Sequence, residues 1–271
     1  MPELPEVETV CRGLSKVITG KKIYKICVLN SKLRYKIPDD LENKIKNKNV
    51  KKILRRGKYG LLVTDGEYDL AFHLGMTGNF IIYNSKPKIY KHDHLLFQFE
   101  KNIFIVYNDI RKFGYIFLTK KPLDLTNFKN LGVEPDQLKN RNCMLYEQIK
   151  KKNSNIKSVL LDQGFIAGIG NIYASEILHV ASVSPKRKAR NISKVTFTRL
   201  LEACNAVILE AISKGGASIK NFNDIDGKLG YFQNEFKVYA REGLSCFACG
   251  NLIKKIKQNG RSTFYCIKCQ R

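Results

Sequence analysis

Apolar side chains at the start of the chain recur at helical spacing. They follow one another at steps of three and four residues: Leu4, Val7, Cys11, Leu14 and Ile18. This is the apolar stripe of an amphipathic α-helix. Pro2 and Pro5 fall in or before its first turn, where a missing N–H costs little. The pattern therefore predicts a helix that begins almost at the first residue.

Between about residues 20 and 120 the pattern changes to short segments rich in β-branched and aromatic side chains, with turn residues between them. The expected strands cover residues 22–29, 50–56, 60–64, 68–74, 79–83, 94–100, 103–107 and 115–119. Their spacing favours a β-sandwich or a barrel. We expect the N-terminal helix to pack against one edge of it and to deliver Pro2 to a cleft.

The strand pattern stops at residues 131–135, which indicates a linker. Helical apolar spacing follows over residues 143–151, 155–163, 172–180 and 199–213, with a glycine-rich break at 164–171. Two glycines ahead of a helix can present backbone N–H groups to a phosphate. Taken alone, such a string is more often just a turn. The polar, glycine-rich stretch 216–233 is expected to be an irregular loop.

The charge balance narrows the class of partner. The chain has 271 residues, 44% of them hydrophobic, which is enough for two domains with cores of their own. Lys and Arg total 48 against 24 Asp and Glu, a formal net charge of +24. Such an excess suits a polyanion, foremost a nucleic acid, better than a neutral metabolite. For any single run of lysines, such as residues 44–52, a solvated surface explains the charge equally well.

The chain shows neither a membrane span nor a secretion signal. No apolar segment approaches the length of about 18 residues that a span needs, and the N-terminus lacks a basic region followed by an apolar core. We therefore expect an intracellular protein with no membrane partner. Four of its eight cysteines are scattered, and in a reducing compartment they are expected to be core thiols: Cys11, Cys27, Cys143 and Cys204.

The other four cysteines form the most specific motif of the chain. Two residues separate Cys246 from Cys249, two separate Cys266 from Cys269, and sixteen lie between the pairs. This spacing is typical of a four-thiolate zinc site on a β-hairpin. Two disulfides are the alternative. Because all four positions would be protein ligands, we expect one structural Zn²⁺ rather than a catalytic one.

The first residues carry a second candidate site. If Met1 is removed, the chain begins with the secondary amine of Pro2. A terminal amine has a pKa of about 7.7–8.0, against about 10.4 for lysine, so far more of it is free base at neutral pH. Such an amine can attack an electrophilic sugar carbon and form an iminium. Glu3 and Glu6 would lie on one face at the positive helix end. An ordinary capped helix is the alternative.

Loops of the expected sheet carry further candidates. Residues 55–60 place three cations around a glycine turn, a shape that can approach phosphate closely. The loops 73–78 and 108–114 hold Met76, Arg111 and Phe113, whose side chains suit the filling of a stack from which a base has been extruded. Taken alone, Met76 and Phe113 are more typical of a core.

A histidine pair, His92 and His94, stands at the entry of an expected strand. Its spacing could serve a metal ion, but no cysteine lies nearby and the chain has only four histidines. DNA contact is therefore the better explanation for this pair.

Together these segments resemble the formamidopyrimidine-DNA glycosylase family, whose members excise oxidised purines and nick the strand. The likeness rests on residues 1–9 (MPELPEVET), on the loops above, on residues 160–176 and on the cysteine spacing, in the family's order over nearly the whole chain. Leu4 resembles the residue found at this position in the formamidopyrimidine-DNA glycosylase branch, whereas the sister endonuclease VIII branch usually has glycine there.

The resemblance implies an α+β multidomain fold. It would consist of an N-terminal β-sandwich with a catalytic N-terminal helix, a C-terminal helical helix-two-turn-helix domain and a zinc-finger β-hairpin. The boundaries expected on this basis are 1–130 for the helix and sandwich, 131–145 for a linker, 146–236 for the helical domain with its lesion-recognition loop, and 237–271 for the zinc-finger hairpin.

The resemblance also implies roles for single residues. Pro2 would be the nucleophile, Glu3 the general acid, and Glu6 a residue that orients this terminus by hydrogen bonds. Lys58 would act in β-elimination, and Arg261 would grip a phosphate and take part in δ-elimination.

The DNA contacts implied in the same way are His92, Arg111, Lys152, Lys157 and Asn171. Met76, Arg111 and Phe113 would fill the void left by the extruded base, and the loop 216–233 would close over that base. The chain departs from the family's usual pattern in two places: Ile110 and Lys112 stand where proline and arginine are common, and Ala217 and Ser218 where two threonines are.

The function implied is that of a bifunctional DNA glycosylase and AP lyase of base-excision repair. Its partner would be double-stranded DNA containing oxidised bases such as 8-oxoguanine and formamidopyrimidines. The family suggests a monomer in a bacterial cytoplasm, associated with the nucleoid. Two alternatives stay open: an endonuclease VIII-like glycosylase for oxidised pyrimidines, and a non-catalytic zinc-containing nucleic-acid-binding protein.

Overall fold

The computed structural model describes residues 2–120, 128–217 and 231–271, and the predicted N-terminal helix is present as α1 (Leu4–Ile18). Its apolar stripe is buried, as the spacing predicts. A capping box begins the helix: the Glu3 side chain accepts from the backbone N–H of Glu6, and the Glu6 side chain accepts from the backbone N–H of Glu3. The cap fixes the conformation of the residues that directly follow Pro2.

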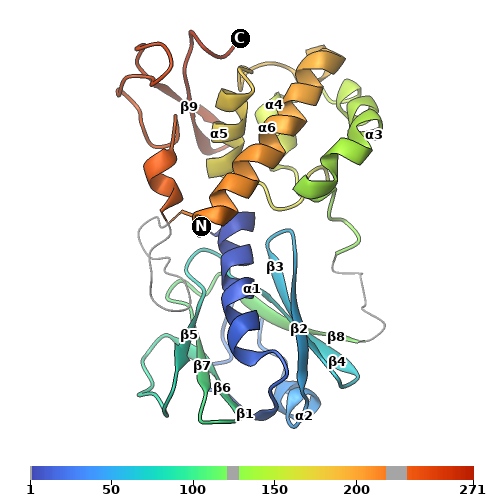
Figure 1. Cartoon of the computed structure of the whole chain (residues 1–271), viewed down its shortest axis with the longest axis vertical. Helices are drawn as coiled ribbons and strands as arrows, with labels where there is room; N and C mark the ends of the chain where they lie inside the picture. Colours follow the sequence, from blue (N-terminus) through green and yellow to red (C-terminus); the bar gives the residue numbers. More distant parts are fainter. Residues whose placement is uncertain (1, 121–127, 218–230) are drawn as a thin grey trace. The chain divides into compact units, whose positions relative to one another are not determined.

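The strand pattern forms two antiparallel sheets, which Figure 1 shows on either side of α1. One sheet has the order β1 (Ile23–Val28), β6 (Asp93–Phe99), β7 (Phe104–Asn108), β5 (Asn79–Tyr83). The other has the order β2 (Val50–Arg56), β3 (Tyr59–Thr64), β4 (Tyr68–His73), β8 (Tyr115–Lys120). The sequence left a sandwich and a barrel open, and the two separate sheets make it a sandwich. A short helix that the pattern did not predict, α2 (Leu41–Ile45), buries Leu41 and Ile45.

One hydrophobic core lies between α1 and the two sheets. Across it, the rings of Phe72 on β4 and Phe80 on β5 meet edge to face with centroids 4.7 Å apart. Gly60 on β3 leaves the space for this contact, because a Cβ there would lie 2.0 Å from the Phe72 ring. The core thus fixes both the helix and the strand ends from which the loops emerge.

The second half of the chain is helical, as predicted, and ends in a β-hairpin. Its helices are α3 (Leu138–Lys150), α4 (Ile156–Leu161), α5 (Asn171–Val180) and α6 (Lys194–Ser213), with short 3₁₀ turns at η2 (Pro135–Gln137), η3 (Ala189–Asn191) and η4 (Phe232–Glu235). The hairpin consists of β9 (Lys254–Gln258) and β10 (Arg261–Tyr265). No helix within the described ranges is long and apolar enough to cross a membrane.

Contacts divide the chain into two compact units. The first comprises residues 1–129 and 214–231, and the second comprises residues 130–213 and 232–271. The hairpin therefore belongs to the same unit as the helices. The finer, four-part division predicted from the sequence stays a prediction.

Candidate functional site

The N-terminal end of α1 is a buried and hydrogen-bonded turn. Pro2 is buried, and Glu3 and Glu6 are only 1% and 2% exposed. One oxygen of Glu6, Oε2, accepts from the backbone N–H of Glu3 at 2.8 Å, and the other, Oε1, accepts from the backbone N–H of Ala217 at 2.8 Å. Glu6 therefore holds this terminus through hydrogen bonds, and it also links the terminus to residue 217.

Ala217 stands at the base of the predicted base-covering loop. It pairs with Tyr231 in an isolated β-bridge, and the N–H of Tyr231 donates to the carbonyl oxygen of Lys214. These contacts close the two ends of the segment over Glu6. Residues 218–230, which make up most of the loop, lie outside the described residues.

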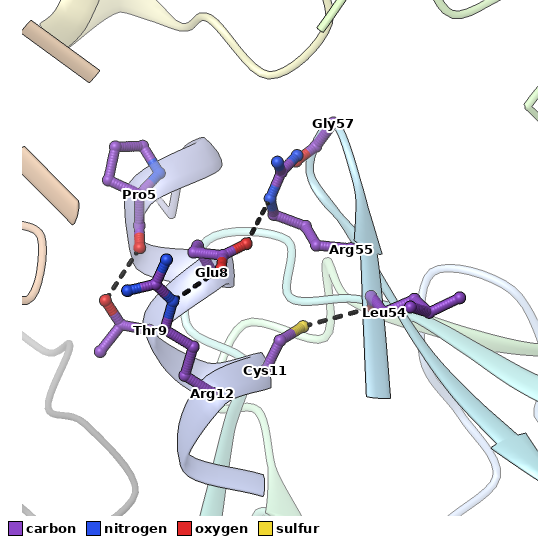
Figure 2. Close-up of polar contacts among 8 residues, drawn as sticks. All are labelled: Pro5, Glu8, Thr9, Cys11, Arg12, Leu54, Arg55 and Gly57. Atoms are coloured by element: carbon purple, nitrogen blue, oxygen red, sulfur yellow. Dashed lines mark hydrogen bonds and ion pairs between the residues drawn. The ribbon is translucent and has the colours of Figure 1, made fainter. Parts of the chain in front are cut away.

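Glu8 joins α1 to strand β2, as Figure 2 shows. Its Oε2 accepts from Arg55 Nε at 2.8 Å, and its Oε1 accepts from Arg12 Nε at 2.7 Å. Burial alone would raise the pKa of Glu8, but the hydrogen bonds from the two guanidinium groups outweigh it and hold the pKa below its usual value. Arg55 also donates to the carbonyl oxygen of Gly57 at 3.2 Å. The start of the helix and the β2–β3 turn are thus held together.

A second link lies beside this ion pair. The Sγ of Cys11 donates to the carbonyl oxygen of Leu54 on β2 at 3.6 Å. Burial raises the pKa of Cys11, and it raises the pKa of Cys204 to about 12. Both thiols therefore stay protonated inside the protein, which agrees with their prediction as core residues. Cys27 is half-buried and Cys143 is exposed, so the same prediction was wrong for Cys143.

Lys58 occupies the two-residue turn between β2 and β3. Arg56 and Tyr59 pair across the turn, and Gly57 has a φ of +56°. A glycine with positive φ at the first central position is typical of a type II′ hairpin. Lys58 is 8% exposed, which is unusual for a lysine outside a functional or paired environment.

His73, at the end of β4, is a neighbour of Lys58 that sequence reasoning missed. Its ring stacks on Tyr115 with centroids 5.1 Å apart and planes 12° apart, and its Nδ1 accepts from the N–H of Gly75 at 3.0 Å. Burial, with the positive charges of Lys58 and Arg34 nearby, lowers the pKa of His73 to about 4. A neutral imidazole at this point adds no further positive charge to the Lys58 turn.

The two loops predicted to act together do meet in the structure. Thr77, next to Met76, donates its hydroxyl to Asp109 Oδ1 at 2.5 Å and accepts from the N–H of Arg111 at 3.0 Å. The Arg111 guanidinium lies over the Phe113 ring, 4.7 Å from its centroid. Arg111 and Phe113 are exposed, and Met76 is half-buried. Their assignment to DNA stays a prediction.

His92 and His94 have different surroundings. His94 is fully buried, and both its ring nitrogens face backbone oxygens, Nδ1 that of Asn30 at 3.1 Å and Nε2 that of Asp109 at 3.0 Å. His94 is thus a structural tie between two loops. The buried Nδ1 of His92 has no hydrogen-bond partner among the described residues. His92 stays the predicted DNA contact of this pair.

In the second unit, Lys157 on α4 is buried and surrounded by acceptors. Its Nζ donates to Asn171 Oδ1 at 2.7 Å, to the Ser262 carbonyl oxygen at 3.0 Å and to Thr263 Oγ1 at 2.7 Å. An ammonium group has three N–H donors, so these acceptors account for all of them. Asn171 Nδ2 also donates to the Ser262 carbonyl oxygen, at 2.9 Å. This geometry favours an indirect role for Lys157, in which it orients Asn171 and the hairpin.

The remaining predicted DNA contacts are at the surface of the same unit. Lys152 pairs with Asp162, Nζ to Oδ2 at 2.9 Å. Arg261 is exposed at the first position of β10, directly after the turn Asn259–Gly260. Both turn residues have positive φ, +47° and +75°, as a type I′ hairpin requires. The hairpin thus presents Arg261 beside the Ser262 carbonyl that Lys157 and Asn171 hold.

The four cysteines of the C-terminal motif converge. The sulfur atoms of Cys246, Cys249, Cys266 and Cys269 all lie within 4.8 Å of one another, and they are the only cluster of potential metal ligands among the residues described. Four thiolates at such separations fit tetrahedral zinc, whose Zn–S bonds are about 2.3 Å long. The cluster is positioned to bind one zinc ion.

The surrounding chain supports this metal centre. The carboxylate of Glu176 on α5 accepts from the backbone N–H groups of Lys237, Val238 and Tyr239 at 2.7–3.0 Å. His179, one turn further along the helix, has its Nε2 3.6 Å from Cys246 Sγ. These contacts join Cys246 and the segment that leads to it to α5.

Comparison with known proteins decides the family. Three family models match the chain: the formamidopyrimidine-DNA glycosylase N-terminal domain over residues 1–116, the H2TH domain of the same enzymes over 131–223, and a zinc finger found in FPG and IleRS over 243–271. The chain belongs to the formamidopyrimidine-DNA glycosylase family.

Relatives of that name cover the whole chain. Those from Wolbachia sp. subsp. Drosophila simulans (strain wRi) and from Zymomonas mobilis are each 40% identical to it, and the match covers 100% of both chains in each case. Among solved structures, a Lactococcus lactis Fpg in complex with abasic-site DNA is 34% identical, with a TM-score of 0.92 over 99% of both chains. A MutM in complex with DNA containing carbocyclic 8-oxo-G is also 34% identical, with a TM-score of 0.90.

The predicted family and fold are therefore confirmed, and so is a four-cysteine zinc finger. The roles of single residues stay predictions, because a family match does not test them. Three residues that position the site were not singled out from the sequence: Glu8, His73 and Asp109. Each acts through a partner distant in the sequence, so no local motif marks it.

Proposed function

We propose that the chain is a bifunctional DNA glycosylase and AP lyase that removes oxidised purines, 8-oxoguanine and formamidopyrimidines, from duplex DNA. The observation that carries the proposal is the N-terminal turn, in which Pro2 and Glu3 are buried and the backbone N–H of Glu3 donates to the Glu6 carboxylate. An ordinary helix start is exposed to solvent, whereas a nucleophile and its acid require a fixed geometry. The excess of positive charge, +24, supports DNA as the partner.

The chemistry follows from the residue types. With Met1 removed, the Pro2 nitrogen attacks C1′ of the damaged nucleoside, the bond from C1′ to the base breaks, and the base leaves with a proton. Glu3, as general acid, gives a proton to O4′ when the sugar ring opens and the iminium forms. This Schiff base is the intermediate common to base removal and strand cleavage.

The iminium then acidifies the C2′ hydrogen. Loss of that proton expels the 3′ phosphate in β-elimination, and loss of a second proton expels the 5′ phosphate in δ-elimination, which leaves a one-nucleoside gap. Lys58, buried in its turn, would serve the first elimination, and exposed Arg261 would grip a phosphate in the second.

The DNA contacts belong to the same proposal. His92, Lys152 and Asn171 would bind the backbone, with Lys157 behind Asn171, while Met76, Arg111 and Phe113 fill the vacated stack. Four thiolates would fill all the coordination positions of a zinc ion, so the ion would hold the hairpin and take no part in the reaction.

We retain the four-part division 1–130, 131–145, 146–236 and 237–271 as part of this proposal. We also retain a monomer in a bacterial cytoplasm, associated with the nucleoid. The positive charge supports the association with the nucleoid, and the bacterial relatives of the same family support the bacterial cytoplasm.

Borohydride trapping on three duplexes tests the proposal against its alternatives. The duplexes carry 8-oxoguanine, an oxidised pyrimidine or no lesion, and the zinc-loaded chain with Met1 removed is incubated with each. We expect covalent trapping and strand cleavage chiefly with 8-oxoguanine. Stronger trapping on the pyrimidine would favour an endonuclease VIII-like specificity. Binding with no trapped complex on either lesion would favour a non-catalytic DNA-binding protein.

A further inference from the structure

We propose that Asp109 is a positioning residue for base extrusion, because it locks the loop that carries Met76 to the loop that carries Arg111 and Phe113. The inference rests on the proposed function, which assigns those three side chains to the vacated base stack. Asp109 itself is fully buried and would not touch DNA.

The Asp109 carboxylate bonds to both loops at once. Its Oδ1 accepts from the Thr77 hydroxyl at 2.5 Å and from the N–H of Arg111 at 3.2 Å, while its Oδ2 accepts from the N–H of Gly114 at 2.8 Å. The Thr77 hydroxyl in turn accepts from the same Arg111 N–H at 3.0 Å. Asp109, Thr77 and the Arg111 backbone therefore form one closed network.

All partners of the carboxylate are donors, so both its oxygens act as acceptors. A carboxylate is acceptor-only, whereas the amide of asparagine has a donor NH₂ on one side. In an asparagine at position 109, this NH₂ would point at a backbone N–H of the loop or at the Thr77 hydroxyl, in the place of an oxygen that accepts from them. An exchange of nearly identical shape therefore removes part of the network without opening a cavity.

The loop from 109 to 114 depends on this network for its shape. Lys112 has a φ of +57°, a left-handed conformation that costs energy for any residue other than glycine. A proline at position 110 would fix the backbone angle φ, but Ile110 does not. The bonds from Asp109 to Arg111 and Gly114 lie on either side of Lys112, so they hold the strained residue from both directions.

The two loops also touch through their backbones. A Cβ on Gly75 would lie 2.3 Å from the Gly114 nitrogen, and a Cβ on Gly114 would lie 1.9 Å from the Tyr107 hydroxyl oxygen. A side chain at either glycine would therefore force the backbone or its neighbours to shift. His94, whose Nε2 contacts the Asp109 carbonyl oxygen, fixes the same residue from the core side.

A fixed loop pair matters for only one part of the reaction. Extruding a base costs a few kcal/mol, and side chains already in the inserting conformation lose less freedom when they fill the gap. A duplex with a preformed abasic site has no base to extrude. Loss of the Asp109 network should therefore slow base excision much more than cleavage at an abasic site.

The test compares Asp109→Asn and Thr77→Val with Thr77→Ser, which keeps the hydroxyl. For each zinc-loaded chain, single-turnover rates are measured on an 8-oxoguanine duplex and on a preformed abasic-site duplex. We expect excision to fall roughly tenfold to a hundredfold for Asp109→Asn and roughly threefold to tenfold for Thr77→Val, the scale of one lost charge-assisted bond or more. Abasic cleavage should change less than about threefold, and Thr77→Ser should match the unaltered chain.

A stopped-flow measurement separates positioning from loss of fold. With 2-aminopurine next to the lesion, the rise in fluorescence on unstacking should slow in the two disrupting variants and not in Thr77→Ser. Equal loss in both reactions, or unaltered excision, would overturn the inference while the proposed function stands. If Asp109→Asn fails to fold, the Thr77 pair decides in the same way. An unaltered chain that excises no base would overturn the proposed function, and the inference with it.

Discussion

His73 makes the stability of the protein depend on pH. Its pKa falls from an ordinary 6.5 to about 4 in the folded state. Between these two pH values the His73 imidazole is protonated in the unfolded chain but neutral in the folded protein. The free energy of unfolding therefore falls as the pH drops from 6.5 towards 4. A shift of this size corresponds to roughly 3 kcal/mol.

His73→Phe should therefore flatten this part of the pH profile, because phenylalanine can stack on Tyr115 but cannot take up a proton. Urea unfolding of both chains at pH 7, 5.5 and 4 measures the difference. An unchanged slope between pH 6.5 and 4 would show that another group causes the loss of stability.

Lys157 allows a direct test of its role on DNA. Affinity for DNA falls with salt, and a lysine that neutralises a phosphate makes the slope of log affinity against log salt steeper by about 0.9, whereas a lysine that orients its neighbours does not. Because its Nζ already faces three acceptors, we expect Lys157→Met to weaken DNA binding and to lower the melting temperature with no change in that slope.

Lys152→Met is the matched control for Lys157→Met. Lys152 is partly exposed and pairs with Asp162, so its loss should make the salt dependence shallower by about one unit. A shallower salt dependence for Lys157→Met would contradict the indirect role and support the direct phosphate contact predicted from the sequence.

At the residue scale, the sequence identified the types of side chain but not their partners. The basic character of Lys157 was visible, yet the acceptors Ser262 and Thr263 lie about a hundred positions away. The same holds for Glu6, whose partner Ala217 is 211 positions distant. Such contacts depend on tertiary structure and leave no local pattern.

The ion pair between Glu8 and Arg55 is the main polar link between α1 and β2. The pKa of Glu8 is lowered, so its contribution to stability is present above the ordinary value of 4.5 and is lost as the pH falls through the lower folded value. We expect Glu8→Gln to lower the free energy of unfolding by about 1–2 kcal/mol at pH 7. The loss should almost vanish at a pH below the folded pKa of Glu8, where the carboxyl is already protonated.

An exposed ion pair provides the control for Glu8→Gln. Glu67 and Lys120 pair at 2.9 Å but are more than half exposed, so Glu67→Gln should cost less than about 0.5 kcal/mol. Both costs come from urea unfolding. Similar costs for the two variants would mean that burial of Glu8 adds nothing to the link.

At the element scale, periodicity predicted the structure well where segments were long or clearly patterned. Helix α1 and strands β2 and β5 have the expected ends. Helix α3 begins earlier than the apolar spacing suggested, because its first turn, from Leu138 to Arg141, is mostly polar. Helix α2 has five residues and two buried ones, too few to establish a period, so packing rather than pattern forms it.

For the molecule as a whole, a zinc ion bound by the four cysteines would stabilise the C-terminal hairpin. Structural zinc supplies on the order of 10 kcal/mol of folding free energy, which a small core of Val238, Ile253 and Phe264 could not replace. We expect Cys269→Ser to lower the zinc content well below one per chain, to unfold the hairpin and to abolish strand cleavage.

Cys143→Ser is the control, because Cys143 is exposed and lies outside the cluster. It should keep one zinc ion per chain and full cleavage. Zinc content by a colorimetric chelator assay and hairpin folding by amide exchange measure both variants. A Cys269→Ser chain with full zinc and a protected hairpin would contradict the assignment.

The order of motifs along the chain was enough to predict the family and the fold class. It was not enough to predict that the hairpin and the helices share one compact unit, which follows from the Glu176 bonds to the backbone of residues 237–239. It also did not predict how residues 109–114 keep their shape without a proline.

The central claim is that the N-terminal nitrogen of Pro2 becomes covalently bound to the sugar. The most direct measurement is peptide mapping by mass spectrometry of the complex that borohydride traps on an 8-oxoguanine duplex. We expect a reduced sugar adduct on the peptide that begins at Pro2, and no such adduct in a folded, zinc-loaded Pro2→Gly chain, which should also lose most of its cleavage rate. An adduct on a lysine side chain such as Lys58, or a Pro2→Gly chain that cuts at the unaltered rate, would contradict it.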